Sequence, residues 1–238
     1  MKVGVPIGDL MAGMFASVGI LAAVRHQTET GKGQFIDIGM LDTHVAWLAN
    51  QGMNYLSTDE NPERLGNQHP NIVPYQVMPT SDGYIVLSIG NDPTFERFCE
   101  LAGETKLLED DRFKTNASRV SNREHVTKVL NEVTKRKTSN EWLSELEKAK
   151  IGCGPINNLS DVFNDPHVIS RKMVMEMEHS KTGEKPLKLI SNPIKMNETP
   201  VSYRYAPPLL GEHTNEILKT ELNLNEDQIK SLKDKNII

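Results

Sequence analysis

The chain is poor in cysteine, and neither sign of charge dominates its surface chemistry. Its two cysteines, Cys99 and Cys153, form no C-x-x-C pair, so a disulfide framework is excluded; with no secretory leader recognised, a reduced, cytoplasmic setting is expected. The net charge is −5 with acidic and basic residues interspersed, which argues against a nucleic-acid partner. The seven histidines are scattered and lack zinc spacing, so no metal site and no permanently bound cofactor are predicted.

A hydrophobic run long enough for a membrane span is also missing. The longest stretch free of both charged residues and histidine is the fifteen residues 10–24, whereas a span needs about 20 apolar residues. Small residues recur through it and let neighbouring backbones approach closely. The pattern predicts a central helix buried in protein, and no membrane partner.

Asp9 stands immediately before this stretch, after Val3, Val5 and Ile7 at strand spacing. One interpretation is an N-cap, because an Asp oxygen accepts a hydrogen bond from an orphan N–H of the first turn. The other is a functional carboxylate at the carboxyl edge of a sheet, kept ionised by the positive end of the helix. An ionised carboxylate is a possible nucleophile, and spacing alone favours the cap.

The order of predicted elements indicates an α/β fold. The first helix continues to about Thr28 and stops at the glycines after Thr30; a strand at 35–38 and a helix at 41–56, bearing His44 and Trp47, follow. This β-α-β-α order is typical of a parallel sheet with crossover helices. A hairpin is predicted at 75–78 and 84–89, and later elements at 92–101, 110–113, 122–135, 140–148, 151–156, 159–163, 173–178, 187–190, 215–222 and 225–233.

Two further sequence features bear on chemistry. No G-x-S-x-G motif is present, because Phe15 precedes Ser17 where the first glycine would stand. The polar, turn-rich passage from residue 61 holds Asn67, Gln68 and His69, which offer hydrogen-bond donors and acceptors. Either a functional loop or a solvated turn fits that passage equally well.

Four motifs, taken in order, resemble the class III CoA-transferases, the family of formyl-CoA transferase, carnitine CoA-transferase and α-methylacyl-CoA racemase. They are VGVPIGDLMAGMFASVGILAAVRHQTETGKGQFIDIGMLD, RLGNQHPNIVPYQVMPTSDGYIVLSIGND, GCGPINN with VFNDPHV, and PPLLGEHTNEIL. The likeness covers essentially the whole chain. The passage from GPINN to VMEMEH also resembles the succinate/glutarate CoA-transferase branch.

The resemblance implies an enzyme that moves CoA from an acyl-CoA, such as succinyl-CoA, to a free carboxylic acid. The aspartate of the family's G-D-x-x-x-G signature is its nucleophile and falls on Asp9, which would form an aspartyl anhydride and then an aspartyl-CoA thioester. The coenzyme A thioester is thus a substrate. By position alone, Asn67, Gln68 and His69 are candidates for a substrate loop. A second possibility is the racemase branch, in which the aspartate instead moves a proton at the α-carbon. A third possibility is a non-catalytic remnant.

The resemblance also implies an architecture. Family members carry a further N-terminal region and form interlocked homodimers, so the expected fold is part of a nucleotide-fold-like parallel sheet domain with a smaller α+β domain inserted, lacking the N-terminal half. Residues 1–60 would be the incomplete large domain with Asp9, residues 61–170 the small α+β domain with its linkers, and residues 171–238 a segment returning to the large domain. Either a homodimer or association with the missing half is expected.

Overall fold

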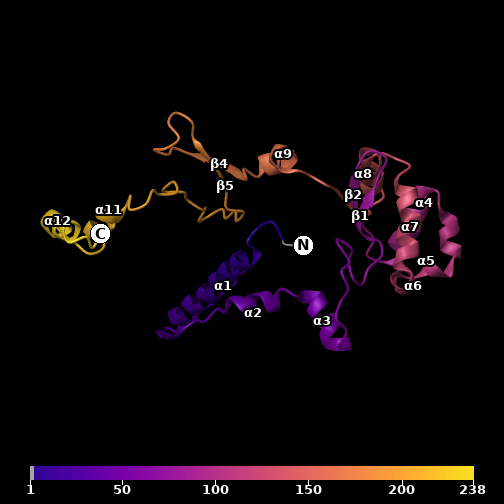
Figure 1. The fold of residues 1–238 in the computed structure, drawn as a ribbon, viewed down its shortest axis with the longest axis horizontal. Coiled ribbons are helices and arrows are strands. Elements are labelled where there is room, and N and C mark those ends of the chain that lie inside the picture. The colour runs from indigo at the N-terminus through magenta and orange to yellow at the C-terminus, as the bar shows by residue number, and fades with distance from the viewer. Residues whose placement is uncertain (1–2) are drawn as a thin grey trace. The chain divides into compact units, whose positions relative to one another are not determined.

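The computed structural model describes residues 3–238, a mixed α/β chain that divides into two compact units, residues 1–156 and 157–238. The first unit begins with helices α1 (Ile7–Thr30), α2 (Met40–Ala46) and α3 (Ala49–Thr58) (Figure 1). The predicted helix at 41–56 is therefore two helices. The predicted family domains at 1–60, 61–170 and 171–238 stay predictions.

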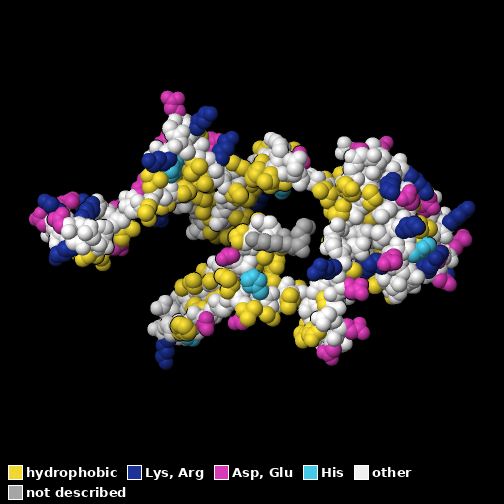
Figure 2. All heavy atoms as spheres, in the orientation of Figure 1, with side chains coloured by type: hydrophobic (Ala, Val, Ile, Leu, Met, Phe, Trp, Pro, Cys, Tyr) yellow, Lys and Arg dark blue, Asp and Glu magenta, His cyan; other side chains and the backbone are white. Residues whose placement is uncertain are grey.

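Helix α1 ends as the sequence predicts but is not buried. Gly31 has a φ of 72° and donates its N–H to the Gln27 carbonyl, a left-handed C-cap that favours glycine. Gly8 is the one buried residue of the helix, and Leu21 is 70% exposed. Figure 2 shows hydrophobic side chains gathered over α1 and α2. The predicted burial is wrong for the described residues, because burial requires partners that a helix does not itself supply.

The length of α1 also corrects the membrane argument. The helix has 24 residues, more than the uncharged stretch within it. Among residues 3–238 it is the helix whose length and composition would allow a membrane crossing. The core helix of a soluble protein and a signal sequence have the same length and composition, so these two properties do not distinguish a membrane span from either of them.

The two strands predicted beside α1 are absent from the described residues. Residues 3–6 are irregular and Ile7 already belongs to α1, while residues 33–39 have no regular secondary structure and no strand pairing. Ile36 and Ile38 lie against Gly19, where an added Cβ would be 3.5 Å from Ile36 Cγ2. A strand needs a neighbour for its backbone N–H and C=O groups, and here none is paired with either segment.

The remainder of the first unit forms the hydrophobic core of the described chain. Strands β1 (Tyr75–Pro79), β2 (Tyr84–Ser88) and β3 (Gly152–Pro155) make an antiparallel sheet in that order, with Val77 opposite Val86. Phe98 and Trp142 stack within the core. The predicted hairpin is confirmed, as are four predicted helices, with bounds Asp92–Ala102 (α4), Asp111–Lys114 (α5), Arg123–Thr134 (α7) and Ser139–Lys148 (α8). Two further helices were not predicted: Thr105–Glu109 (η1, 3₁₀) and Asn116–Ser121 (α6).

The second unit holds a separate two-stranded sheet. Strands β4 (Val174–Met177) and β5 (Leu187–Ile190) fall within two of the predicted elements and pair antiparallel. Met175 and Met177 are half-buried while Glu176 between them is exposed, so the strand has one face toward the protein and one toward solvent. The helices of this unit are α9 (Leu159–Asn164), α10 (Pro166–Ser170), α11 (Thr214–Thr220) and α12 (Glu226–Asp234).

The two thiols differ in accessibility, and this difference predicts their reactivity. Burial raises the pKa of Cys99 to about 12 and also raises the pKa of Cys153, while Cys99 is fully buried and Cys153 only half-buried. Because the thiolate is the reactive form, an aromatic disulfide reagent at pH 8 should modify Cys153 slowly and Cys99 only after unfolding in urea. Equal rates for both thiols in the folded protein would contradict this.

Candidate functional site

Asp9 lies within the first turn of α1 and is not its N-cap. The cap position is Pro6, without a side-chain hydrogen bond, because the helix starts two residues before Asp9. The N-cap interpretation is therefore wrong. The Asp9 side chain is exposed, and within residues 3–238 no hydrogen bond or ion pair engages its carboxylate. The positive end of the helix dipole favours its ionised form, so the arrangement presents an accessible anionic oxygen.

His44, on α2, packs against the residue before Asp9. A Cβ added to Gly8 would lie 2.2 Å from His44 Cε1 and 2.3 Å from His44 Nε2, so no side chain fits at residue 8 while the ring stays in place. The ring is held from its other side, because Nδ1 is 2.8 Å from the Met40 carbonyl oxygen. The first turn of α1 thus has an imidazole beside it.

A shallow hollow lies further along the same two helices. Phe15 of α1, Asp37 of the segment before α2 and Asp42 of α2 line it, and its volume is about 190 Å³. Two carboxylates in the lining repel an anion. The hollow is therefore poorly suited to hold a carboxylate substrate.

Asn67 and His69 extend the free edge of β1. Asn67 Oδ1 accepts a hydrogen bond from Val77 N at 2.8 Å, and His69 N donates to Tyr75 O at 2.9 Å. These contacts satisfy backbone groups of an edge strand. The side-chain oxygen of Asn67, a predicted substrate-loop residue, thus holds the strand edge.

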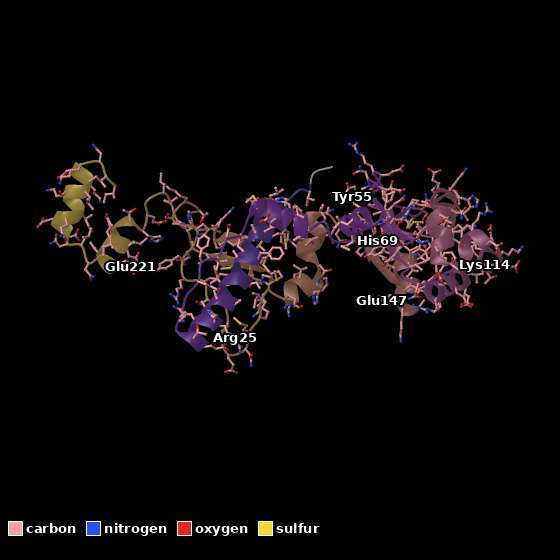
Figure 3. The ribbon with its side chains drawn as sticks, turned by 90° about the horizontal axis from the view of Figure 1, so that it is seen from below. Arg25, Tyr55, His69, Lys114, Glu147 and Glu221 are labelled. Atoms are coloured by element: carbon pink, nitrogen blue, oxygen red, sulfur yellow. The ribbon has the colours of Figure 1, made fainter. Side chains whose placement is uncertain are left out.

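The His69 ring is fixed on one side and open on the other. Nδ1 accepts a hydrogen bond from Asn71 N at 3.1 Å, and the ring stacks on Tyr75 with centroids 5.3 Å apart. In the neutral ring the proton is therefore on Nε2, which has no hydrogen-bond partner among residues 3–238. Figure 3 labels His69 on the segment between α3 and β1. His69 can donate one hydrogen bond to a ligand.

Gln68 lies between Asn67 and His69, the two residues that are hydrogen-bonded to β1. Its N–H donates to Leu65 O at 3.1 Å, and its Oε1 is 3.5 Å from Arg123 Nη1. Within the described residues no hydrogen bond joins Asp9 to Asn67, Gln68 or His69. The contacts instead place His44, which sequence reasoning put on a helix without a role, against Gly8, the residue before Asp9. The available signal was Gly8, since a glycine inside a helix often marks a close approach.

Comparisons with known proteins identify the family. The model of CoA-transferase family III matches residues 1–214. The chain is 38% identical to the succinate–glutarate CoA-transferase of Agrobacterium fabrum over 92% of this chain and 54% of that protein. It is 37% identical to the human succinyl-CoA:glutarate CoA-transferase over 96% of this chain and 52% of that protein.

A solved structure agrees with these relatives. The CAIB/BAIF family protein from Brucella suis superposes with a TM-score of 0.72 at 37% identity, covering 93% of this chain and 57% of that one. The chain spans about half the length of the curated relatives it matches. With a family match over most of its residues, the chain belongs to CoA-transferase family III.

Proposed function

We propose that this chain is part of an enzyme that transfers CoA from succinyl-CoA to a free dicarboxylic acid, with Asp9 as the nucleophile. The observation that carries the proposal is the exposed, unpartnered carboxylate in the first turn of α1. It stands in a Gly8-Asp9 pair within the part of the chain that matches the family. The names of the relatives support the donor and the class of acceptor.

The chemistry needs no ATP, because each bond formed is comparable in energy to the one broken. Asp9 attacks the thioester carbonyl and gives a mixed anhydride with release of CoA thiolate. The sulfur then attacks the aspartyl carbonyl, which gives an aspartyl-CoA thioester and frees the donor acid. The acceptor carboxylate repeats these steps in reverse. The positive end of α1 stabilises the negative oxygen of each tetrahedral intermediate.

The chain matches only about half the length of its curated relatives, which bears on how the active protein is assembled. Residues 33–39 are not paired with any strand in the described part of the chain, and many apolar side chains of α1 are exposed. We propose that the segment joins a parallel sheet whose other strands belong to the part of the family fold that this chain does not match. The same assembly, or a homodimer, would cover α1.

A transfer assay tests the proposed function. The purified chain, alone and mixed with the unmatched part of the Agrobacterium relative, is incubated with succinyl-CoA and glutarate, and glutaryl-CoA is measured by chromatography. Its formation in either sample is expected. Deuterium uptake at the α-carbon of the acyl-CoA without any acceptor acid would instead indicate the isomerase branch, and neither reaction in folded protein would indicate a non-catalytic chain.

Alanine at His69 should weaken binding of the acceptor acid. Losing one hydrogen bond to a carboxylate costs about 1.5–3 kcal/mol, so the KM for glutarate should rise by roughly 10-fold or more while kcat changes less. The control is His167→Ala, because His167 is exposed on α10 and its ring makes no hydrogen bond in the described residues. Unchanged kinetics in His69→Ala would remove His69 from the site.

A further inference from the structure

Three polar side chains hold the backbone of residues 70–73, the segment that follows His69. The hydrogen bonds run from Arg123 Nη2 to Pro70 O at 2.6 Å, from Asn116 Nδ2 to Asn71 O at 2.8 Å and from Arg119 Nε to Val73 O at 2.7 Å. All three donors come from α6 and the start of α7. Because each of these carbonyls has a side-chain donor, the segment has a fixed path along the two helices.

Arg123 acts on the peptide group next to His69. Its acceptor, the Pro70 carbonyl, belongs to the same trans peptide group as Asn71 N–H, and that N–H donates to His69 Nδ1 at 3.1 Å. A trans peptide group is planar, and its C=O and N–H point in opposite directions. A guanidinium that fixes the carbonyl therefore also aims the N–H at the imidazole.

A second contact and the charge of Arg123 strengthen this arrangement. Arg123 Nη1 lies 3.5 Å from Gln68 Oε1, so the guanidinium contacts the residue on each side of His69. A hydrogen bond from a cation is stronger than one from a neutral donor. It also polarises the peptide group, which makes Asn71 N–H a better donor to the ring.

The position of Arg123 is unfavourable for its own helix. Arg123 is the first residue of α7, where the positive end of the helix dipole disfavours a cation. Burial lowers the pKa of its guanidinium, and among the described residues no carboxylate forms an ion pair with it. Helix formation therefore does not account for an arginine here, and the contacts with Gln68 and Pro70 are the favourable ones.

We propose that Arg123 is a positioning residue that acts through the Pro70–Asn71 peptide group and holds the His69 ring with its Nε2–H available to the acceptor acid. This assignment rests on the proposed function, in which His69 binds that acid. Nδ1 accepts the hydrogen bond from Asn71 only when it carries no proton, so the same contact places the proton of the neutral ring on Nε2. Without the guanidinium the peptide group is free to rotate, and both tautomers of the ring become available.

Kinetics test this role. The full chain, in the assembly that supports transfer, is compared with Arg123→Met over a range of glutarate concentrations. The KM for glutarate should rise about 10-fold, as expected when one hydrogen bond to a carboxylate is lost, while kcat changes less. In the double variant with His69→Ala, the KM should rise no further than in His69→Ala alone, because the two residues act as one unit. The matched control is Arg97→Met, which removes a guanidinium that among the described residues contacts Pro93 and Thr94 of its own helix and should keep the wild-type KM.

Nitrogen-15 NMR of the His69 ring gives a readout independent of activity. In the wild type the neutral ring should carry its proton on Nε2. In Arg123→Met, shown to be folded by its urea unfolding curve, both tautomers should appear. Arg123→Lys keeps the charge without the planar fork of donors, so it should give an intermediate result, and it replaces Arg123→Met if methionine prevents folding.

The outcomes separate the role of Arg123 from the proposed function. A wild-type KM in the Arg123 variants, a KM in the double variant that rises by the product of the single effects, or an unchanged His69 tautomer would overturn the assignment. If the wild type transfers no CoA, the proposed function fails, and the NMR comparison alone then decides whether Arg123 orients the ring.

Discussion

Asparagine at position 9 should lower kcat/KM for CoA transfer by at least about 10³-fold, as expected when a covalent nucleophile is removed. The amide has nearly the shape of the carboxylate but cannot form the anhydride. Since the Asp9 side chain is exposed and has no partner within residues 3–238, the substitution should leave the fold unchanged. Glutaryl-CoA formation measures the first effect and circular dichroism the second.

A second carboxylate nearby provides the control. Asp37 is also exposed and belongs to the segment packed along α1. Asp37→Asn removes the same charge from the same part of the molecule and should retain most of the activity. If Asp9→Asn stays within a few-fold of the wild type, the carboxylate of Asp9 does not perform the chemistry.

Methionine at position 119 should destabilise the first unit by roughly 2–6 kcal/mol, the cost of leaving two buried acceptors unpaired. The Arg119 guanidinium is fully buried. Its Nε donates to Val73 O at 2.7 Å, and its Nη1 donates to Phe113 O at 2.8 Å. Methionine fills much of the volume but satisfies neither carbonyl.

Two further contacts of Arg119 contribute less to the stability of the first unit. Its Nη2 pairs with Asp92 at 2.8 Å, but the Asp92 side chain is 47% exposed and is solvated without the arginine. The guanidinium lies 4.3 Å from the Phe95 ring centroid, a cation–π contact. Urea unfolding followed by tryptophan fluorescence measures the loss. Arg112→Met, which breaks an exposed pair with Asp110, should leave the midpoint nearly unchanged, and an equal loss in both variants would contradict the account.

Local sequence signals predicted the elements whose turns and helix caps are formed by residues close together in the sequence. The hairpin of β1 and β2 forms around a short turn, and α4 begins where Asn91 accepts a hydrogen bond from Thr94 N. Thr138 and Glu141 make a capping box at α8. Each of these signals involves residues a few positions apart, so the sequence alone contains them.

Non-local features were not predictable in the same way. The burial of α1 and the pairing of residues 35–38 depend on which groups lie beside them, and within residues 3–238 those neighbours are not supplied. His44 reaches Gly8 only because the chain turns back along α1 after Gly31. The edge-strand role of Asn67 likewise requires Val77, ten residues later. These contacts arise from folding, and residue type alone does not reveal them.

The most direct test of the central claim is to trap the covalent intermediate on Asp9. The chain, alone and with the unmatched part of the Agrobacterium relative, is mixed with succinyl-CoA, treated with borohydride and digested for mass spectrometry. We predict that Asp9 is reduced to homoserine in at least one sample and that Asp9→Asn shows no modification there. An unmodified Asp9 peptide from folded protein in both samples would contradict the nucleophile assignment.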